Sequence, residues 1–319
     1  MKTVFIINPQ AGKRKNLKAF INNIKCRISN INDTEIYVTR CVGDACCFVR
    51  NYCLNYGPAR FVACGGDGTL NEVINGAIGF DGVQIGVIPS GTGNDFFRNF
   101  VASADNSFDG DVNLVKCDVI KYKSYTEDGI KEGYCANMFN IGFDCNVADL
   151  TASIKEKPFL SGSLAYFISI LITLIRKKGS DLKIELDGRC VHNGKLLLTS
   201  IANGCYCGGG IKSNPYACVT DGYININIIK NVSRRKFVSL LPYYMKGTIF
   251  TRKKAENLIS TEKCTNITVT PNGGEMRICI DGEITDAGKT EFKILHNAFD
   301  FVIPCKISNI SANNVSTKC

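Results

Sequence analysis

A glycine-rich loop directly after a short apolar run constrains the fold of this chain more than any other feature. Arg60–Ala63 has the character of a buried strand. After Cys64 come three glycines, a carboxylate and a hydroxyl: Gly65, Gly66, Asp67, Gly68 and Thr69. Glycine adopts positive φ and lets backbone N–H groups approach a ligand, so such a loop is typical of a phosphate site. The helical spacing that follows predicts a helix N-terminus, whose positive end favours the same anion.

A second loop of the same kind follows the next apolar run, Val83–Ile88. It combines glycines, hydroxyls and a carboxylate in the order Pro89, Ser90, Gly91, Thr92, Gly93, Asn94 and Asp95. Loops at the carboxyl ends of neighbouring parallel strands open into one crevice, so both loops are expected to meet one ligand. A bare carboxylate would repel a phosphate, and Asp67 therefore implies a metal ion or a transferable proton.

Strand-like and helical segments alternate in the first part of the chain, which predicts an α/β domain with a parallel sheet covered on both faces. The predicted strands are Thr3–Ile7, Thr34–Thr39, Arg60–Ala63 and Val83–Ile88. The predicted helices are Leu17–Ile28, Ala45–Tyr56 and Leu70–Ile78. The boundary of this domain is expected near Asn113–Asp118.

From Val119 onward the predicted strands lie closer together, which indicates a mostly antiparallel β domain. They are Val119–Tyr125, Gly133–Ile141, Leu182–Leu186, Lys195–Ala202, Tyr223–Ile229, Asn266–Thr270, Met276–Ile280 and Thr290–Leu295. One helix, Phe159–Ile175, interrupts them, and it falls short of the ~20 apolar residues that span a bilayer. Phe299–Pro304 is a further strand that the pattern alone assigns to neither domain.

Composition narrows the class of protein. A chain of 319 residues with 45% hydrophobic content is expected to form two domains. Seventeen cysteines, an odd number without a Cys-x-x-Cys pair, favour reduced thiols in a cytoplasmic protein. The opening apolar run Val4–Ile7 is too short for a signal peptide. Two histidines exclude a His-rich zinc site.

The net charge of +9 gathers in four basic clusters. They are Lys13–Lys15, Arg176–Lys178, Arg234–Lys236 and Arg252–Lys254. Such clusters suit nucleotide phosphate, nucleic acid or an anionic membrane, although each one alone is more often a solvated face. Interleaved aromatic motifs are missing, so no nucleic-acid partner is expected. Phe159–Ile175 with its basic flanks instead indicates either a packed helix or a peripheral membrane contact.

Three further clusters are weaker on their own. Asn8, Pro9 and Gly12 follow the first strand but lack the ending of a P-loop. The segment 203–223 contains a triple glycine and an Asp221–Gly222 pair, and 281–283 reads Asp-Gly-Glu. Both Asp-Gly pairs are by default hairpin turns.

Taken in order, these clusters resemble the diacylglycerol kinase catalytic-domain family of lipid kinases, in particular its soluble bacterial members. The matching pieces span nearly the whole chain: Asn8–Gly12, Gly65–Glu72, Pro89–Arg98, Asn140–Gly142, Gly208–Gly222 and Asp281–Glu283. The first glycine loop also occurs in NAD kinases. The second loop is much more specific to lipid kinases.

The resemblance implies that ATP binds in a cleft between a Rossmann-like domain, 1–118, and a C-terminal β-sandwich, 119–298, with 299–319 returning to the first domain. The residues expected near the nucleotide are Asn8, Thr39, Gly65, Gly66, Asp67, Gly68, Thr69, Gly91 and Thr92. Asp67, Asp95 and Asp118 would organise Mg²⁺, and Glu283 would be the catalytic base. Asp221, with backbone oxygens of Cys218 and Tyr223, is similar to a second Mg²⁺ site of bacterial members.

The substrate implied by the resemblance is a lipid hydroxyl at a membrane surface, most simply that of diacylglycerol. A sphingoid base, a monoacylglycerol or a polyprenol remains an alternative substrate. Assembly as a homodimer is also left open. A NAD kinase and a nucleotide-binding regulator without catalysis are the alternatives from other classes. The expected location is the cytoplasm, in peripheral contact with the inner face of the membrane.

Overall fold

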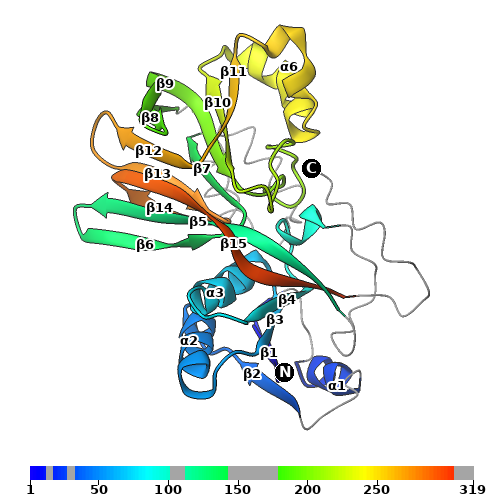
Figure 1. The fold of residues 1–319 in the computed structure, drawn as a ribbon. Helices are drawn as coiled ribbons and strands as arrows, with labels where there is room; N and C mark the ends of the chain where they lie inside the picture. Colours follow the sequence, from blue (N-terminus) through cyan, green and yellow to red (C-terminus); the bar gives the residue numbers. More distant parts are fainter. Residues whose placement is uncertain (12–16, 27–32, 101–111, 143–178, 305–319) are drawn as a thin grey trace.

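The computed structural model describes residues 1–11, 17–26, 33–100, 112–142 and 179–304. Their strands form one 15-stranded hydrogen-bonded sheet with a parallel part and an antiparallel part. Figure 1 shows the parallel part with its helices at one end and the antiparallel strands above it. An α/β half followed by an antiparallel β half confirms the predicted fold class. The predicted helix Phe159–Ile175 lies outside the described residues.

The parallel strands run in the order β2-β1-β3-β4. Their bounds are β1 (Thr3–Ile7), β2 (Thr34–Val38), β3 (Arg60–Gly65) and β4 (Gln84–Pro89). The helices between them are α1 (Leu17–Cys26), α2 (Asp44–Tyr56) and α3 (Asp67–Ala77). Ile24 of α1 packs with Phe5 and Val62, whereas α2 and α3 pack on the opposite face. Alternating apolar residues of each strand therefore pack against two helical layers, one on each face of the sheet.

The antiparallel half is built around a second apolar cluster. Its strands are β6 (Gly129–Cys135), β7 (Met138–Gly142), β8 (Ser180–Leu186), β9 (Arg189–Ala202), β10 (Ile224–Lys230), β11 (Ile259–Cys264), β12 (Asn266–Pro271), β13 (Met276–Ile280) and β14 (Glu283–Ala287). The predicted single strand Gly133–Ile141 is wrong, because the chain turns at Ala136–Asn137 and forms two strands. No helix among the described residues is long and apolar enough to cross a membrane.

Short helices complete the described part of the chain. They are η2 (Phe97–Asn99), α6 (Arg234–Met245), η3 (Ile249–Thr251) and η4 (Lys253–Ala255). The sequence pattern did not predict the longest of them, α6. Ser233 caps α6 by accepting a hydrogen bond from the N–H of Lys236 at 3.4 Å. Pro242 stands inside this helix, which weakens its pattern in the sequence.

Two long strands join the halves. β5 (Val112–Thr126) and β15 (Lys289–Pro304) pair antiparallel from Tyr125↔Lys289 to Val112↔Pro304. Near its end, β15 also pairs in parallel with β4 through Asp300 and Phe301. The segment 299–304, which the pattern alone left unassigned and the resemblance returned to the first domain, is the end of β15 beside the parallel strands. The boundary expected near Asn113–Asp118 falls inside β5.

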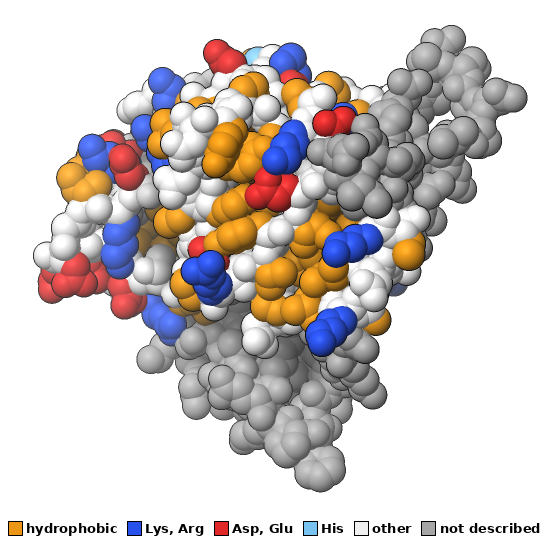
Figure 2. All heavy atoms as spheres, turned by 90° about the horizontal axis from the view of Figure 1, so that it is seen from below, with side chains coloured by type: hydrophobic (Ala, Val, Ile, Leu, Met, Phe, Trp, Pro, Cys, Tyr) orange, Lys and Arg blue, Asp and Glu red, His pale blue; other side chains and the backbone are white. Residues whose placement is uncertain are grey.

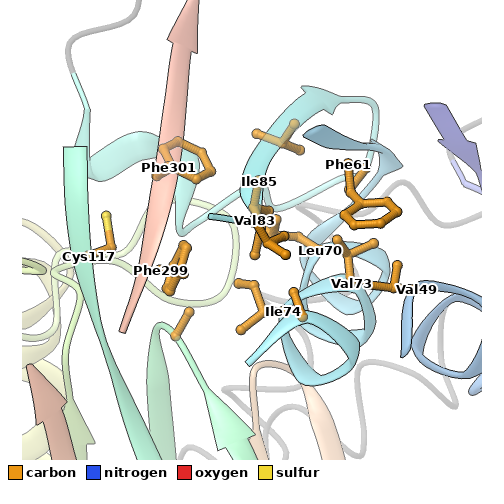
Figure 3. Close-up of a cluster of buried hydrophobic side chains, with 14 of the residues drawn as sticks. Val49, Phe61, Leu70, Val73, Ile74, Val83, Ile85, Cys117, Phe299 and Phe301 are labelled. Carbon is orange, nitrogen blue, oxygen red and sulfur yellow. The ribbon is translucent and has the colours of Figure 1, made fainter. Parts of the chain in front are cut away.

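The end of β15 completes the core of the α/β half (Figure 3). Phe299 and Phe301 lie beside Ile85 and Ile74 in this cluster. The ring of Phe301 meets that of Phe96 edge to face, with centroids 5.2 Å apart. Burial of each phenylalanine contributes roughly 1.5–3 kcal/mol, so the return of the chain stabilises the first half directly.

Asn75 ties α3 to the antiparallel half. Its Nδ2 donates to the carbonyl of Tyr134 at 2.8 Å, and its Oδ1 accepts from the N–H of Tyr134 at 2.8 Å. The amide thus pairs with β6 as a neighbouring strand would. Because α3 starts at the first glycine loop, this contact sets the position of that loop relative to the second half.

The prediction of reduced thiols holds for the described cysteines with one exception. Cys218 is disulfide-bonded.

Replacing Asn75 by alanine should lower the free energy of unfolding by about 2 kcal/mol, because both backbone groups of Tyr134 lose their partner. Urea unfolding measures the change. Asn55→Ala is the matched control, since that amide bonds only the Asn51 carbonyl on the exposed face of α2, and it should cost less than about 0.5 kcal/mol. Equal losses of stability in the two variants would contradict the role of Asn75 as a clamp between α3 and β6.

Candidate active site

The two glycine loops leave adjacent strands and touch backbone to backbone. Gly65 and Pro89 are the last partners of the β3–β4 pair, and the N–H of Ser90 donates to the Gly65 carbonyl at 2.9 Å. A Cβ at Gly91 would lie only 2.5 Å from Cα of Gly66. The contact leaves no room for a side chain, which explains the glycines at both positions.

Asp67 and Asp95 lie on either side of Gly93. A Cβ at Gly93 would come within 2.8 Å of Asp67 Oδ2 and 3.2 Å of Asp95 Oδ2. Asp67 begins α3 and accepts from the N–H of Phe96 at 3.2 Å. Asp95 is buried and accepts from the N–H of Gly209, in the antiparallel half, at 2.9 Å. The structure therefore brings these two predicted carboxylates together.

The electrostatics of this pair favour a cation. Burial raises the pKa of Asp67, and the charge of Asp95 raises it further. Burial also raises the pKa of Asp95, against the N–H groups of Gly209 and Gly210 and the charge of Arg98. Asp95 Oδ1 is buried without a hydrogen bond, although Arg98 Nε lies 3.6 Å away. Mg²⁺ takes carboxylate oxygens, so this donor set fits it.

Asp118 lies in a different setting. Its carboxylate is buried and accepts from the N–H groups of Gly222 at 2.7 Å and Asn297 at 2.8 Å, and contacts His296 Nδ1 at 2.8 Å. His296 and Asn297 fall where the β5–β15 register shifts. The carboxylate thus stabilises the irregular part of the β5–β15 pair. Its role with Mg²⁺ stays a prediction.

Asp221 is paired with a lysine. Lys263 Nζ lies 2.6 Å from Asp221 Oδ2, while Oδ1 accepts from the N–H of Tyr223 at 3.1 Å. The described residues contain no group of three or more His, Cys, Asp and Glu side chains suited to a metal ion. The second Mg²⁺ site at Cys218, Asp221 and Tyr223 stays a prediction, in which the cation would compete with Lys263.

Glu283 comes to the site from the antiparallel half. It is the first residue of β14, after a two-residue turn in which Asp281 and Gly282 have φ of 47° and 98°. Two positive φ values are typical of a type I′ hairpin. Glu283 Oε1 lies 3.4 Å from the position of a Cβ on Gly68, at the start of α3. Partial burial and the charge of Glu72 raise the pKa of Glu283.

Asp281 fixes this turn. Its N–H donates to the Met138 carbonyl at 3.1 Å, and its Oδ1 accepts from the Met138 N–H at 2.9 Å. The thiol of Cys135 donates to Oδ2 at 3.2 Å. Burial raises the pKa of Asp281 to about 7, and the charges of Asp67 and Asp95 add to the shift. The residue expected to form an ordinary turn is therefore an anchor for Glu283.

The remaining predicted nucleotide residues lie near the carboxyl ends of the parallel strands. Asn8 follows β1, and its Nδ2 donates to Thr69 Oγ1 at 3.1 Å. Thr39 follows β2, and its N–H donates to the Ile7 carbonyl at 2.9 Å. The carbonyl of Thr92 lies 3.6 Å from the position of a Cβ on Gly209. Both glycine loops and these hydroxyls thus border one edge of the sheet.

Two positioning residues have distant partners that no local pattern in the sequence predicted. Asn99 Oδ1 accepts from the N–H of Cys205 at 2.7 Å and so ties the second loop to the antiparallel half. Glu72 accepts from the N–H groups of Gly43 and Ala45, and so satisfies the start of α2 from α3. Neither pairing is local in the chain, so no short motif could have revealed it.

An anion cradle with paired carboxylates, faced by a third carboxylate across two halves of the chain, defines a phosphoryl-transfer enzyme. Residues 2–120 match the family model of the diacylglycerol kinase catalytic domain. Residues 137–303 match the YegS C-terminal NAD kinase beta sandwich-like domain. The chain belongs to the diacylglycerol kinase catalytic-domain family and is an ATP-dependent kinase. The resemblance inferred from the motifs is confirmed.

Relatives match over nearly their whole lengths. A diacylglycerol kinase of Bacillus subtilis (strain 168) is 25% identical over 94% of this chain and 95% of that protein. One of Staphylococcus carnosus (strain TM300) is 28% identical over 95% of each. A solved structure of a putative diacylglycerol kinase from Bacillus anthracis has a TM-score of 0.71 at 21% identity and covers 95% of this chain and 97% of its own. This last likeness concerns the fold.

Gly91→Ala should weaken ATP binding at least roughly tenfold, because the new Cβ forces the two loops apart and overpacking of this kind costs ~1–3 kcal/mol. Titration calorimetry with ATP measures the change. Gly273→Ala is the control, since a Cβ there would meet nothing within 4 Å. Unchanged affinity in Gly91→Ala would contradict the close contact of the loops.

The raised pKa of Asp281 predicts a pH-dependent stability. The folded state binds this proton more tightly than the unfolded state, whose pKa is near 3.8. Wild-type stability should therefore fall, relative to Asp281→Asn, as pH rises from about 4 to about 7. Urea unfolding with a metal chelator at about pH 5 and about pH 8 measures this difference. Asp286→Asn on β14 is the control, and the same pH slope in wild type and Asp281→Asn would contradict the prediction.

Proposed function

We propose that this protein is a lipid kinase that transfers the γ-phosphate of ATP to the hydroxyl of diacylglycerol and forms phosphatidic acid. The observation that carries the proposal is the approach of Glu283 to Gly68, at the start of the helix that follows the first glycine loop. In the proposed reaction, this carboxylate would lie where an acceptor hydroxyl meets the terminal phosphate. The full-length relatives named diacylglycerol kinase support diacylglycerol as the acceptor.

The phosphates of ATP would lie against the two glycine loops. The unpaired N–H groups at the start of α3 and its positive end bind anions and tolerate growing charge in the transition state. Asn8 and Thr69 already form a hydrogen-bonded pair at this edge, and Thr92 borders it from the second loop. Thr39 is assigned to the base or ribose because it follows β2, the outermost parallel strand.

Asp67 and Asp95 would hold Mg²⁺, with Asp118 behind them. The bound ion supplies positive charge to the triphosphate. The two aspartates would fix its position from both loops at once, since one opens α3 and the other is held by Gly209. The raised pKa values of both carboxyl groups would fall again once the cation neutralises them.

Glu283 would act as the general base. The hydroxyl proton of the lipid passes to its carboxylate while the lipid oxygen forms a bond to the γ-phosphorus and the bond to the ADP oxygen breaks. Its raised pKa makes it a better proton acceptor than an exposed glutamate. The hydrogen bonds of Asp281 would keep the carboxylate in place during this transfer.

Such an enzyme would act in the cytoplasm, where ATP is supplied, and would meet its substrate at the inner face of the membrane. The acceptor could also be a sphingoid base, a monoacylglycerol or a polyprenol, each of which offers a hydroxyl on an apolar body. NAD would be the acceptor if the protein were instead a kinase of a soluble metabolite. It is considered because the C-terminal match is described as NAD kinase beta sandwich-like. Phosphorylation with labelled ATP across diacylglycerol, sphingosine, monoacylglycerol, polyprenol and NAD decides between them.

Glu283→Gln should lower kcat at least ~10²-fold, because the amide cannot accept the proton, while the affinity for ATP changes little. Labelled-ATP assays with diacylglycerol in detergent and calorimetry with ATP measure the two effects. Glu132→Gln on β6 is a matched control that should keep full turnover. Near-normal turnover of Glu283→Gln would show that another group takes the proton.

A further inference from the structure

The segment from Asn231 to Ala255 is strongly cationic. It contains seven Lys and Arg residues and no carboxylate: Arg234, Arg235, Lys236, Lys246, Arg252, Lys253 and Lys254. Two of the basic clusters seen in the sequence fall in this segment. The guanidinium of Arg252 lies over the ring of Tyr243 in α6, with 3.4 Å to the ring centroid. Arg252 is thereby held against the helix.

The inner face of α6 belongs to the core of the protein. Leu240, Leu241 and Tyr244 line an apolar pocket together with residues of β9, β10 and β11. These contacts anchor α6 on the antiparallel half.

The outer face of α6 carries apolar side chains in solvent. Val238, Pro242 and Met245 recur at positions i, i+4 and i+7, which places them along one stripe. Val238 is 52% exposed and Met245 is 37% exposed. Arg235 and Lys246 are exposed beside them, and Lys236 is exposed on the first turn of the helix. An apolar stripe bordered by cations without carboxylates is the pattern of a helix that lies in a membrane interface.

We propose that the outer face of α6, with the exposed residues Lys246, Arg252 and Lys253, docks on the surface of an anionic lipid bilayer. Each Lys or Arg near an anionic leaflet increases partitioning roughly fivefold, so several together suffice for reversible binding. The exposed stripe would enter the boundary between headgroups and acyl chains. Docking on a bilayer is a different property from phosphoryl transfer and can be measured without ATP, although it gives the proposed lipid kinase its route to substrate.

Docking at α6 would hold the active site close to the lipid surface. The carbonyl of Met245, at the end of α6, accepts from the N–H of Lys212 at 3.1 Å. Three residues earlier, the N–H of Gly209 donates to Asp95 at 2.9 Å. Three residues span at most ~10 Å, so one short segment connects the docking helix with the carboxylate pair.

The opposite end of the molecule is a poorer match to an anionic surface. Figure 2 shows that face from below, with hydrophobic side chains among both positive and negative ones. Leu54 and Tyr56 in α2, and Val42 just before this helix, are more exposed than the stripe of α6. Acidic residues nevertheless lie in this region, with Asp44 at the start of α2 and Glu35 in β2. Mixed charge opposes binding to an anionic leaflet, whereas the segment at α6 carries a single sign.

Flotation of the full chain with vesicles tests this proposal. The vesicles are phosphatidylcholine alone, or phosphatidylcholine and phosphatidylglycerol in equal parts. Wild type should float with the anionic vesicles at low salt and dissociate as salt increases. The variant Arg235→Glu/Lys236→Glu should lose at least about tenfold in partitioning. Val238→Ser/Met245→Ser should also lose partitioning, because the stripe no longer enters the interface.

The matched control is Lys18→Glu/Lys25→Glu in α1, which reverses two exposed charges at the other end of the molecule (Figure 1). This control should float as wild type does. All variants should keep wild-type turnover on diacylglycerol dispersed in detergent, because no substituted residue belongs to the active site. The proposal is overturned if wild type ignores anionic vesicles, or if the α1 variant loses as much binding as the α6 variant. Failure to phosphorylate diacylglycerol would instead count against the proposed function alone.

Discussion

The pairing of β5 with β15 is the contact on which the rest of the molecule depends. One end of the pair lies in the antiparallel half, and the other end places Phe299 and Phe301 in the core of the α/β half. Asp118 holds the irregular step between Leu295 and Phe299 by accepting from two backbone N–H groups and contacting His296. Because both halves share these strands, the glycine loops of one and the Glu283 hairpin of the other face each other in a fixed way. The Asn75 clamp reinforces the same arrangement from α3.

The site concentrates negative charge that the fold alone does not neutralise. Burial raises the pKa values of Asp67, Asp95, Asp281 and Glu283, so each of these four carboxylates opposes folding in its charged form. Arg98 compensates only Asp95, and one oxygen of that residue has no hydrogen bond. Such unrelieved charge is typical of a site that is completed by a cation and a substrate rather than by the protein itself.

Local patterns predicted much of the fold and part of the site. The alternation of strands and helices placed β1 to β4, because glycine loops and apolar periodicity are properties of neighbouring residues. The split between β6 and β7 was missed, since the turn at Ala136–Asn137 contains neither glycine nor proline. Helix α6 was missed because Pro242 and its basic residues obscure the apolar period.

Contacts between distant residues lay beyond the reach of the sequence. Asp67 and Asp95 could be placed together from two similar loops on neighbouring strands. The pairing of Asp221 with Lys263, the clamp from Asn75 to Tyr134 and the anchoring of Asp281 at Met138 join residues with no motif in common. These partners follow from strand register and from the crossing of the two halves, which only the assembled sheet determines.

The hydrogen bond from Gly209 to Asp95 has a consequence for ligand binding. Asp95 belongs to a loop of the α/β half, whereas Gly209 belongs to the antiparallel half. Moving the halves apart would remove a donor that favours the charged carboxylate and would weaken its hold on a cation. If Asp95 holds the proposed cation, binding of that cation would, by thermodynamic reciprocity, strengthen the contact between the halves to the same extent. A single backbone N–H would then couple cation affinity to the junction of the two halves.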